Sequence, residues 1–170
     1  MCGIAGAITN KPIEEYYIKN AISTLNHRGP DAFGKSIFIN LAGEFITFVH
    51  TRLSILDLDQ RSNQPMRYKN IELIFNGEIY NYLELREDLS NEFNFKTDSD
   101  TEVLLMLLYK KGLSGLKECE GMFSLAFFDH SKSILYLARD KFGEKPIYYY
   151  KDKKKIIVGS DLKIYKEFKD

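Results

Sequence analysis

The residue with the clearest chemical potential is Cys2, which directly follows the initiator methionine. If Met1 is removed, Cys2 becomes the first residue and carries a free α-amine beside its own thiol. An α-amine titrates near ~7.7 to 8.0 and a free thiol near ~8.5, so at neutral pH part of the amine can accept the thiol proton. Nucleophile and base would then share one residue. From Met-Cys-Gly alone, a small cysteine that packs the first strand is the more common explanation, so support must come from elsewhere.

A second chemical feature is the pair Asn76-Gly77, which follows the apolar run 71–75 and is expected at the end of that strand. The side-chain amide of Asn76 and the backbone N–H of Gly77 can converge on one point, as the oxyanion of a tetrahedral intermediate requires. Asn-Gly is also the commonest short hairpin turn. A helical pattern follows Gly77, not a pairing strand, and this slightly favours the oxyanion interpretation.

Three charged residues are candidates for binding the two ends of an amino acid. Arg52 follows a strand expected to end at His50, and a guanidinium can hold a carboxylate through two parallel N–H bonds. Glu78 and Asp100 can accept hydrogen bonds from an α-ammonium. The alternatives are a surface ion pair for Arg52 and a carboxylate at a helix start for the other two. Position alone leaves both interpretations open.

The elements that position these residues follow from apolar spacing. Residues 4–9 are small and apolar, as in a strand buried on both faces, and a helical stretch follows over 13–25. The loop 27–31 is broken by Gly-Pro. Strand-like runs at 36–40 and 45–50 flank Ala42-Gly43 and predict a hairpin.

Two further helices are expected, over 79–89 and from Ser99 to about Tyr109. Ser99 and Glu102 form a capping-box pattern that places Asp100 in the first turn. Strand-like runs at 122–128, 134–138, 147–150 and 156–158 predict an antiparallel meander. The lysine-rich segment 151–155 is expected to be a solvated turn.

Composition limits the classes of function. A length of 170 residues suits one domain, and 24 basic residues balance 24 acidic ones, which gives no electrostatic footprint for nucleic acid. Cys2 and Cys119 form neither a disulfide framework nor a zinc spacing, so we expect a reducing, cytoplasmic location and a structural thiol at Cys119. The three histidines have no metal-ligand spacing, and no metal is predicted. No run is long enough for a membrane span or a secretory signal.

Seven motifs occur in one order along the chain: MCGI at the start, HRGPD at 27–31, HTRLSILD at 50–57, NGEIYN at 76–81, SDTEVLL at 99–105, GMFSLAFFD at 121–129 and LARDKFGEKPIYYY at 137–150. This series resembles the glutaminase domain of glutamine-dependent asparagine synthetase, a class II glutamine amidotransferase of the N-terminal nucleophile hydrolase superfamily. The resemblance covers essentially all of residues 1–170. HRGPD and the run from 139 to 150 favour the asparagine synthetase branch.

The resemblance implies an α+β fold, a four-layer αββα sandwich of two mainly antiparallel sheets with helices outside. It implies Cys2 as the nucleophile and Asn76 and Gly77 as the oxyanion donors. The implied substrate-binding residues are Arg52 for the carboxylate, Asp100 for the ammonium, Glu78 for the polar end, and Leu53, Ser54, Ile55 and Leu56 lining the pocket with backbone groups. The HRGPD loop is expected to shape the chain near the site.

The implied reaction is hydrolysis of the glutamine side-chain amide to glutamate and ammonia through a Cys2 thioester. ATP and Mg belong to a synthetase domain whose Gly-rich loop is not found in these residues, so no cofactor is expected in this domain. The expected partner is a synthetase domain, in the same longer chain or in a partner subunit; residues 159–163 resemble the family's junction and favour a fragment. No nucleic acid or membrane partner is expected.

Two alternatives remain at this point. One is a non-catalytic module that binds glutamine or docks on a synthetase. The other is a hydrolase of the same superfamily that cleaves another amide. The acceptor of the ammonia, aspartate or another carboxylate, also stays open.

Overall fold

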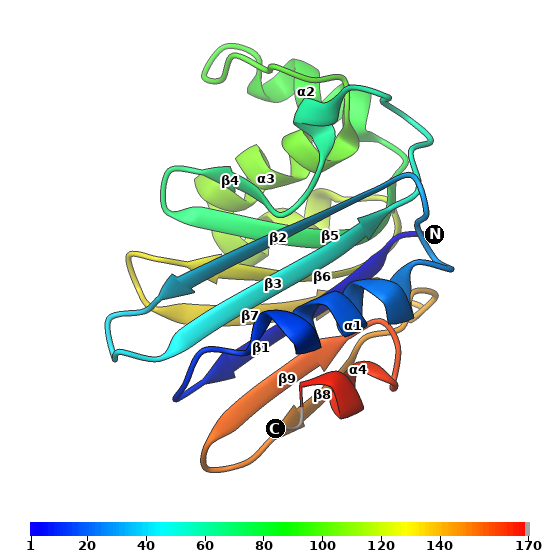
Figure 1. Ribbon diagram of the computed structural model, residues 1–170. Coiled ribbons are helices and arrows are strands. Elements are labelled where there is room, and N and C mark those ends of the chain that lie inside the picture. Colours follow the sequence, from blue (N-terminus) through cyan, green and yellow to red (C-terminus); the bar gives the residue numbers. More distant parts are fainter. Residues whose placement is uncertain (169–170) are drawn as a thin grey trace.

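The computed structural model describes residues 1–168 as two facing β-sheets with helices on their outer sides (Figure 1). The first sheet has the order β2-β3-β1-β9-β8, from β1 (Gly3–Thr9), β2 (Ala32–Ile39), β3 (Phe45–Arg52), β8 (Tyr148–Lys151) and β9 (Lys155–Gly159). The second has the order β4-β5-β6-β7, from β4 (Met66–Tyr68), β5 (Ile71–Ile79), β6 (Gly121–Asp129) and β7 (Ile134–Arg139). Every pairing is antiparallel.

The helices form the two outer layers. Helices α1 (Glu15–Leu25) and α4 (Ile164–Glu167) pack on the first sheet, and α2 (Tyr82–Leu89) and α3 (Asp100–Lys111) pack on the second. Two short 3-10 helices, η1 (Gln60–Ser62) and η2 (Gly112–Glu118), complete the elements described. The α+β, αββα fold class is therefore confirmed. No helix within residues 1–168 is long and apolar enough to cross a membrane.

Strand β1 is the central strand of the first sheet, and its small apolar residues make this possible. Ala5 and Ala7 face α1, while Ile4 and Ile8 face the second sheet. Successive side chains of a strand alternate between its faces, so Cys2 lies on the same side as Ile4, towards the second sheet. The pairing of Gly3 with Thr51 of β3 then fixes the start of the chain beside the end of β3.

The expected end of the strand at Asn76-Gly77 is wrong, because β5 continues to Ile79 and Gly77 pairs with Phe123 of β6. The two strands approach so closely there that a Cβ on Gly77 would lie 2.1 Å from the Met122 carbonyl oxygen. Only glycine fits this contact without moving a backbone. The following helix accordingly begins at Tyr82 and not at residue 79.

The predicted single meander in the last third is also wrong. Strands β6 and β7 belong to the second sheet, whereas β8 and β9 belong to the first. The chain crosses from the second sheet to the first over residues 140–147. The spacing of apolar residues predicts strands but does not indicate which sheet each strand joins. The lysine-rich turn between β8 and β9 is confirmed, as is the hairpin of β2 and β3, in which β3 runs to Arg52 and not to His50.

Helix α3 begins as predicted, with a modified cap. The Ser99 hydroxyl accepts the backbone N–H of Glu102 at 3.3 Å. The reciprocal bond of a capping box is not made, because the Glu102 carboxylate accepts the N–H groups of Lys96 and Thr97 instead. Glu102 thus ties the preceding loop to the helix, and Asp100 is placed in the first turn, next to β5.

Candidate active site

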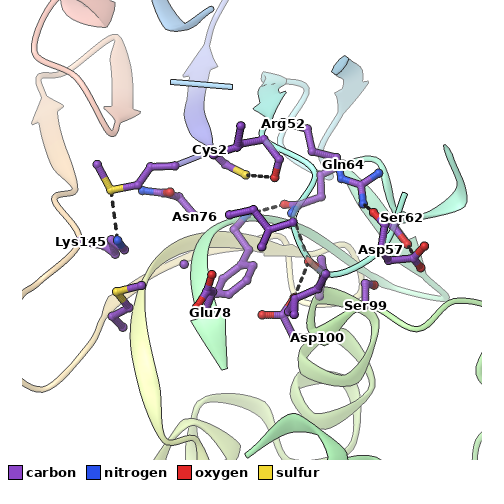
Figure 2. Close-up of a pocket in the computed structure, with 18 residues that line it drawn as sticks. Cys2, Arg52, Asp57, Ser62, Gln64, Asn76, Glu78, Ser99, Asp100 and Lys145 are labelled. Carbon is purple, nitrogen blue, oxygen red and sulfur yellow. Dashed lines mark hydrogen bonds between the residues drawn. The ribbon is translucent and has the colours of Figure 1, made fainter. Parts of the chain in front are cut away.

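A cavity of about 190 Å³ lies where the start of β1, the end of β3, β5 and the start of α3 meet (Figure 2). Nine of the predicted site residues line it: Cys2, Arg52, Leu53, Ile55, Leu56, Asn76, Gly77, Glu78 and Asp100. Ser54, the tenth predicted residue, is not among the residues that line the cavity. Its backbone N–H is turned outward and donates to the Asp31 carboxylate at 2.8 Å.

Cys2 is held by its backbone and leaves its thiol facing the cavity. The guanidinium Nε of Arg28 donates to the Cys2 carbonyl at 3.2 Å, and the thiol lies 3.9 Å from the Leu53 carbonyl oxygen. Burial raises the pKa of the Cys2 thiol above its ordinary value, because a thiolate loses solvation there. With Met1 attached, the thiol is therefore protonated at neutral pH and needs a base to react.

The N–H of Gly77 points into the cavity. On either side of it, the Phe75 N–H donates to Gln64 Oε1 at 2.6 Å and the Ile79 N–H donates to Asp100 Oδ2 at 3.0 Å. In an antiparallel strand, alternate residues direct their N–H groups to the same edge, so Gly77 shares this direction. Phe123, opposite Gly77, uses its own N–H and C=O on Asp140.

Asn76 faces Cys2 from the opposite sheet. It lies on the same side of β5 as Ile74, in the layer between the sheets, and its side chain is fully buried. Neither its amide nitrogen nor its amide oxygen has a hydrogen-bond partner among residues 1–168. A buried amide without a partner costs about 1 to 3 kcal/mol, and a ligand with an oxyanion would supply the missing acceptor.

His50 supports this part of β5 without lining the cavity. Its Nε2–H donates to the Phe75 carbonyl oxygen at 3.2 Å, one residue before Asn76. Complete burial lowers the pKa of His50 to about 3, so the ring is neutral at ordinary pH. The ring therefore fixes the backbone and contributes no charge.

Arg52 combines a structural and a binding capacity. Its Nη1 donates to the Asp59 carbonyl and to Asn63 Oδ1, each at 2.9 Å, and its Nη2 donates to the Asp57 carbonyl. Three of the five N–H donors of a guanidinium are thus used to hold the loop 57–63, which leaves two for a carboxylate in the cavity. The predicted clamp is compatible with this geometry.

Asp100 is buried in the opposite wall of the cavity. Its Oδ2 accepts the Ile79 N–H, and burial raises the pKa of Asp100 to about 6. An ammonium ion placed beside it would offset the cost of that buried charge. Glu78 also lines the cavity, one residue beyond Gly77.

The HRGPD loop supports the backbone on two sides of the cavity. Arg28 bonds to Cys2, Gly29 packs so closely that a Cβ there would lie 2.5 Å from the Thr51 carbonyl oxygen, and Asp31 fixes the Ser54 backbone. The loop thus sets the path of the chain on both sides of the cavity, as the resemblance led us to expect.

Several cavity residues were not predicted. The Gln64 side chain accepts the Phe75 N–H, as a neighbouring strand would. Asp57 accepts the Ser62 hydroxyl at 2.7 Å, which ties together the loop 57–63 that Arg52 contacts. Lys145 lines the cavity next to Met1. Asp57 and Lys145 lie inside quoted motifs, whereas no spacing rule points to Gln64.

The remaining thiol differs from Cys2. Burial raises the pKa of Cys119 to about 12, and its thiol faces the Gly115 carbonyl at 3.7 Å, away from the cavity lining. This agrees with a structural role. Among residues 1–168, no three His, Cys, Asp or Glu side chains lie together as a potential metal site.

The model of one protein family, described as a glutamine amidotransferase domain, matches residues 1–169. The chain is 39% identical to a putative asparagine synthetase (glutamine-hydrolyzing) 2 of Methanocaldococcus jannaschii, with 96% of this chain and 34% of the relative covered. It is 37% identical to asparagine synthetase (glutamine-hydrolyzing) 1 of Bacillus subtilis, with 96% and 26% covered. The amidase chry2 of Gibberella zeae is 32% identical, with 99% and 27% covered.

Among solved structures, the glutamine phosphoribosylpyrophosphate amidotransferase of Bacillus subtilis superposes with a TM-score of 0.78 at 20% identity. The match covers 97% of this chain and 43% of that one. At this identity the likeness concerns the fold alone. The chain spans about a quarter to a third of the length of the curated relatives above.

Proposed function

The chain belongs to the glutamine amidotransferase domain family, and from this premise we propose that it hydrolyses the side-chain amide of glutamine to glutamate and ammonia. One observation carries the proposal: the Cys2 thiol faces, across the gap between the sheets, a buried Asn76 amide without a partner and an inward-directed Gly77 N–H. A nucleophile opposite two unused donors is the arrangement that acyl transfer requires.

The chemistry begins at Cys2 after Met1 is removed. The α-amine takes the thiol proton, directly or through a water molecule, while the sulfur bonds to the side-chain carbonyl carbon of glutamine. Asn76 and Gly77 donate to the oxyanion of the resulting tetrahedral intermediate. The protonated amine then gives its proton to the leaving nitrogen, and the carbon–nitrogen bond breaks to release ammonia.

The second half of the cycle regenerates the thiol. Water attacks the γ-glutamyl thioester, and the α-amine accepts a proton from it. The same two donors stabilise the second oxyanion. The carbon–sulfur bond then breaks, the sulfur takes the proton back from the amine, and glutamate leaves. No step in this domain needs a cofactor.

Arg52 and Asp100 determine which amide is cleaved. The free N–H groups of Arg52 suit an α-carboxylate, and Asp100, with Glu78, suits an α-ammonium. Ile55 and Leu56, whose side chains are exposed, also line the cavity. This spacing of charges favours a free amino acid over a simple amide.

The fate of the ammonia belongs to the larger protein. The relatives are several times longer than this chain, and two of those reported are named as glutamine-hydrolyzing asparagine synthetases. We therefore assign the ammonia to a synthetase domain, in the same chain or a partner subunit, which would use ATP and Mg there to activate an aspartate or another carboxylate. Because Cys2 must stay a free thiol, the cytoplasm remains the proposed location.

Glutamine hydrolysis by protein with a verified Cys2 N-terminus tests the proposal. Ammonia release that disappears in Cys2→Ala but persists in Cys119→Ala is the expected result. If correctly processed protein binds glutamine and releases no ammonia, the chain is a binding module instead. Faster cleavage of simple amides than of glutamine would indicate a different hydrolase.

A further inference from the structure

Lys145 is a buried cation in the cavity wall that the mechanism above does not use. Lys145 is only 7% exposed, and its ammonium group donates to the Met1 thioether sulfur at 3.1 Å (Figure 2). No other partner of this ammonium occurs among residues 1–168. Removal of Met1 deletes that partner. Five covalent bonds join the Met1 sulfur to the Cys2 nitrogen, so the ammonium lies within roughly 10 Å of the nitrogen that becomes the α-amine.

The loop that carries Lys145 is rigidly built. The Asp140 carboxylate accepts four backbone N–H groups, those of Phe123, Phe142, Glu144 and Lys145. Gly143 turns the loop with a φ of 69°, and the Arg139 guanidinium donates to its carbonyl oxygen. The motif from 139 to 145 thus folds onto one carboxylate and places Lys145 in the cavity.

Several other charged side chains around Cys2 each have at least one hydrogen-bond partner within the protein. Arg28 donates to the Cys2 carbonyl, and Arg52 donates to the loop 57–63. Asp57 accepts from Ser62, and Asp100 accepts from Ile79. Arg52 and Asp100 act on the Cys2 thiol with opposite signs. Glu78 and Lys145 also line the cavity, and Lys145 is the cation there whose partner is Met1.

We propose that Lys145 is a positioning residue that keeps the α-amine of mature Cys2 neutral, so that the amine can accept the thiol proton. A like charge disfavours protonation of its neighbour, and at this separation in a half-enclosed cavity the effect is roughly one pKa unit. The inference rests on the proposed function, since the protonation state of the amine matters only if the amine is the base.

The test compares pH profiles of kcat/KM for glutamine in processed wild-type protein and three variants. Lys145→Met and Lys145→Gln should shift the acidic limb of the profile to higher pH by roughly one unit. On that limb, kcat/KM at a given pH should fall about 10-fold, whereas the plateau at high pH should be nearly unchanged. Lys145→Arg should restore the wild-type limb. Lys141→Met, at an exposed position of the same loop, is the control and should change nothing.

A second readout avoids glutamine altogether. The rate of Cys2 alkylation by iodoacetamide against pH should show the same shift in the two neutral variants, and Asp100 ionisation does not enter through substrate binding. If wild-type protein hydrolyses glutamine but the neutral variants keep the wild-type limb, or change only KM, the role of Lys145 is refuted. If wild-type protein is inactive, the proposed function fails, and the pH dependence of alkylation still measures the effect of Lys145 on the coupled thiol and α-amine of Cys2.

Discussion

Gly77 and Phe123 face each other across β5 and β6 at a distance that leaves no room for a side chain on Gly77. The same glycine directs its N–H into the cavity, between two N–H groups that the protein itself uses. The close approach of the strands and the proposed oxyanion donor are therefore one structural feature, because the strand cannot move without moving the donor.

Gly77→Ala is expected to lower kcat by at least about 10²-fold, because the new Cβ must push β5 away from the Met122 carbonyl. Stability should fall as well, by about 1 to 3 kcal/mol, as in other overpacked sites. Steady-state kinetics and urea unfolding measure the two effects. Gly43→Ala, in an open turn, should leave kcat unchanged. A fully active Gly77→Ala protein would contradict the placement of the donor.

Asn76→Ala should separate activity from stability. We expect kcat to fall by about 10² to 10³-fold, with stability unchanged or slightly increased, because the amide has no partner among residues 1–168. Ser124→Ala is the matched control, since Ser124 pairs with Asn76, is buried and also lacks a partner. Its kcat should stay close to that of the wild type. A large loss of stability in Asn76→Ala would show that the amide is structural.

Asp100 predicts a pH dependence of substrate binding. With a pKa of about 6, it carries the charge needed for an α-ammonium only above that pH. The KM for glutamine should therefore rise as the pH falls below about 6. Asp100→Asn should raise KM at pH 7.5 and remove this pH dependence. Initial rates measured from about pH 5 to 8, in steps of about half a pH unit, test both expectations.

The same residue predicts a trade-off with stability. The folded-state pKa of about 6 lies above the ordinary 3.8, so ionised Asp100 destabilises the fold above pH 6 and this penalty fades as the pH falls towards 4. Asp100→Asn keeps an acceptor for the Ile79 N–H and should be more stable by about 1 to 3 kcal/mol at pH 7.5. Urea unfolding should show the gain shrinking at acidic pH. An equal gain in stability at pH 7.5 and at acidic pH would contradict the raised pKa of Asp100.

Processing of Met1 should act as a switch. Protein that retains residues ahead of Cys2 lacks the α-amine and has Met1 in the cavity, so no glutamine hydrolysis is expected. Cleavage that makes Cys2 the first residue should restore it, as ammonia release and intact mass together would show. The same additional residues placed after the C-terminus serve as the control. Activity in unprocessed protein would rule out the amine as base.

Much of the site was predictable because its signals are local. Cys2 follows Met1 directly, the α3 cap is specified by Ser99, and the continuous apolar run of β1 predicts burial on both faces. Each of these depends on neighbouring residues in the chain. The motifs then identified Arg52, Asn76 and Asp100, all of which line the cavity.

Other features depended on contacts between distant segments. The continuation of β5 through Gly77 required β6 as its partner, and the division of the last four strands between two sheets required the crossing at 140–147. Gln64, which replaces a strand beside Phe75, and Ser54, which turns away from the cavity, follow from loop paths that periodicity does not describe.

The sequence by itself therefore determined the family and the class of fold and predicted the nucleophile, because these depend on residue types and short spacings. Only the tertiary structure decided that Asn76 is buried without a partner, that the Gly77 N–H points inward and that Lys145 lies beside Met1. The physical reason is that hydrogen bonding, burial and charge at one point depend on every segment that meets there, and five segments far apart in the chain meet around Cys2.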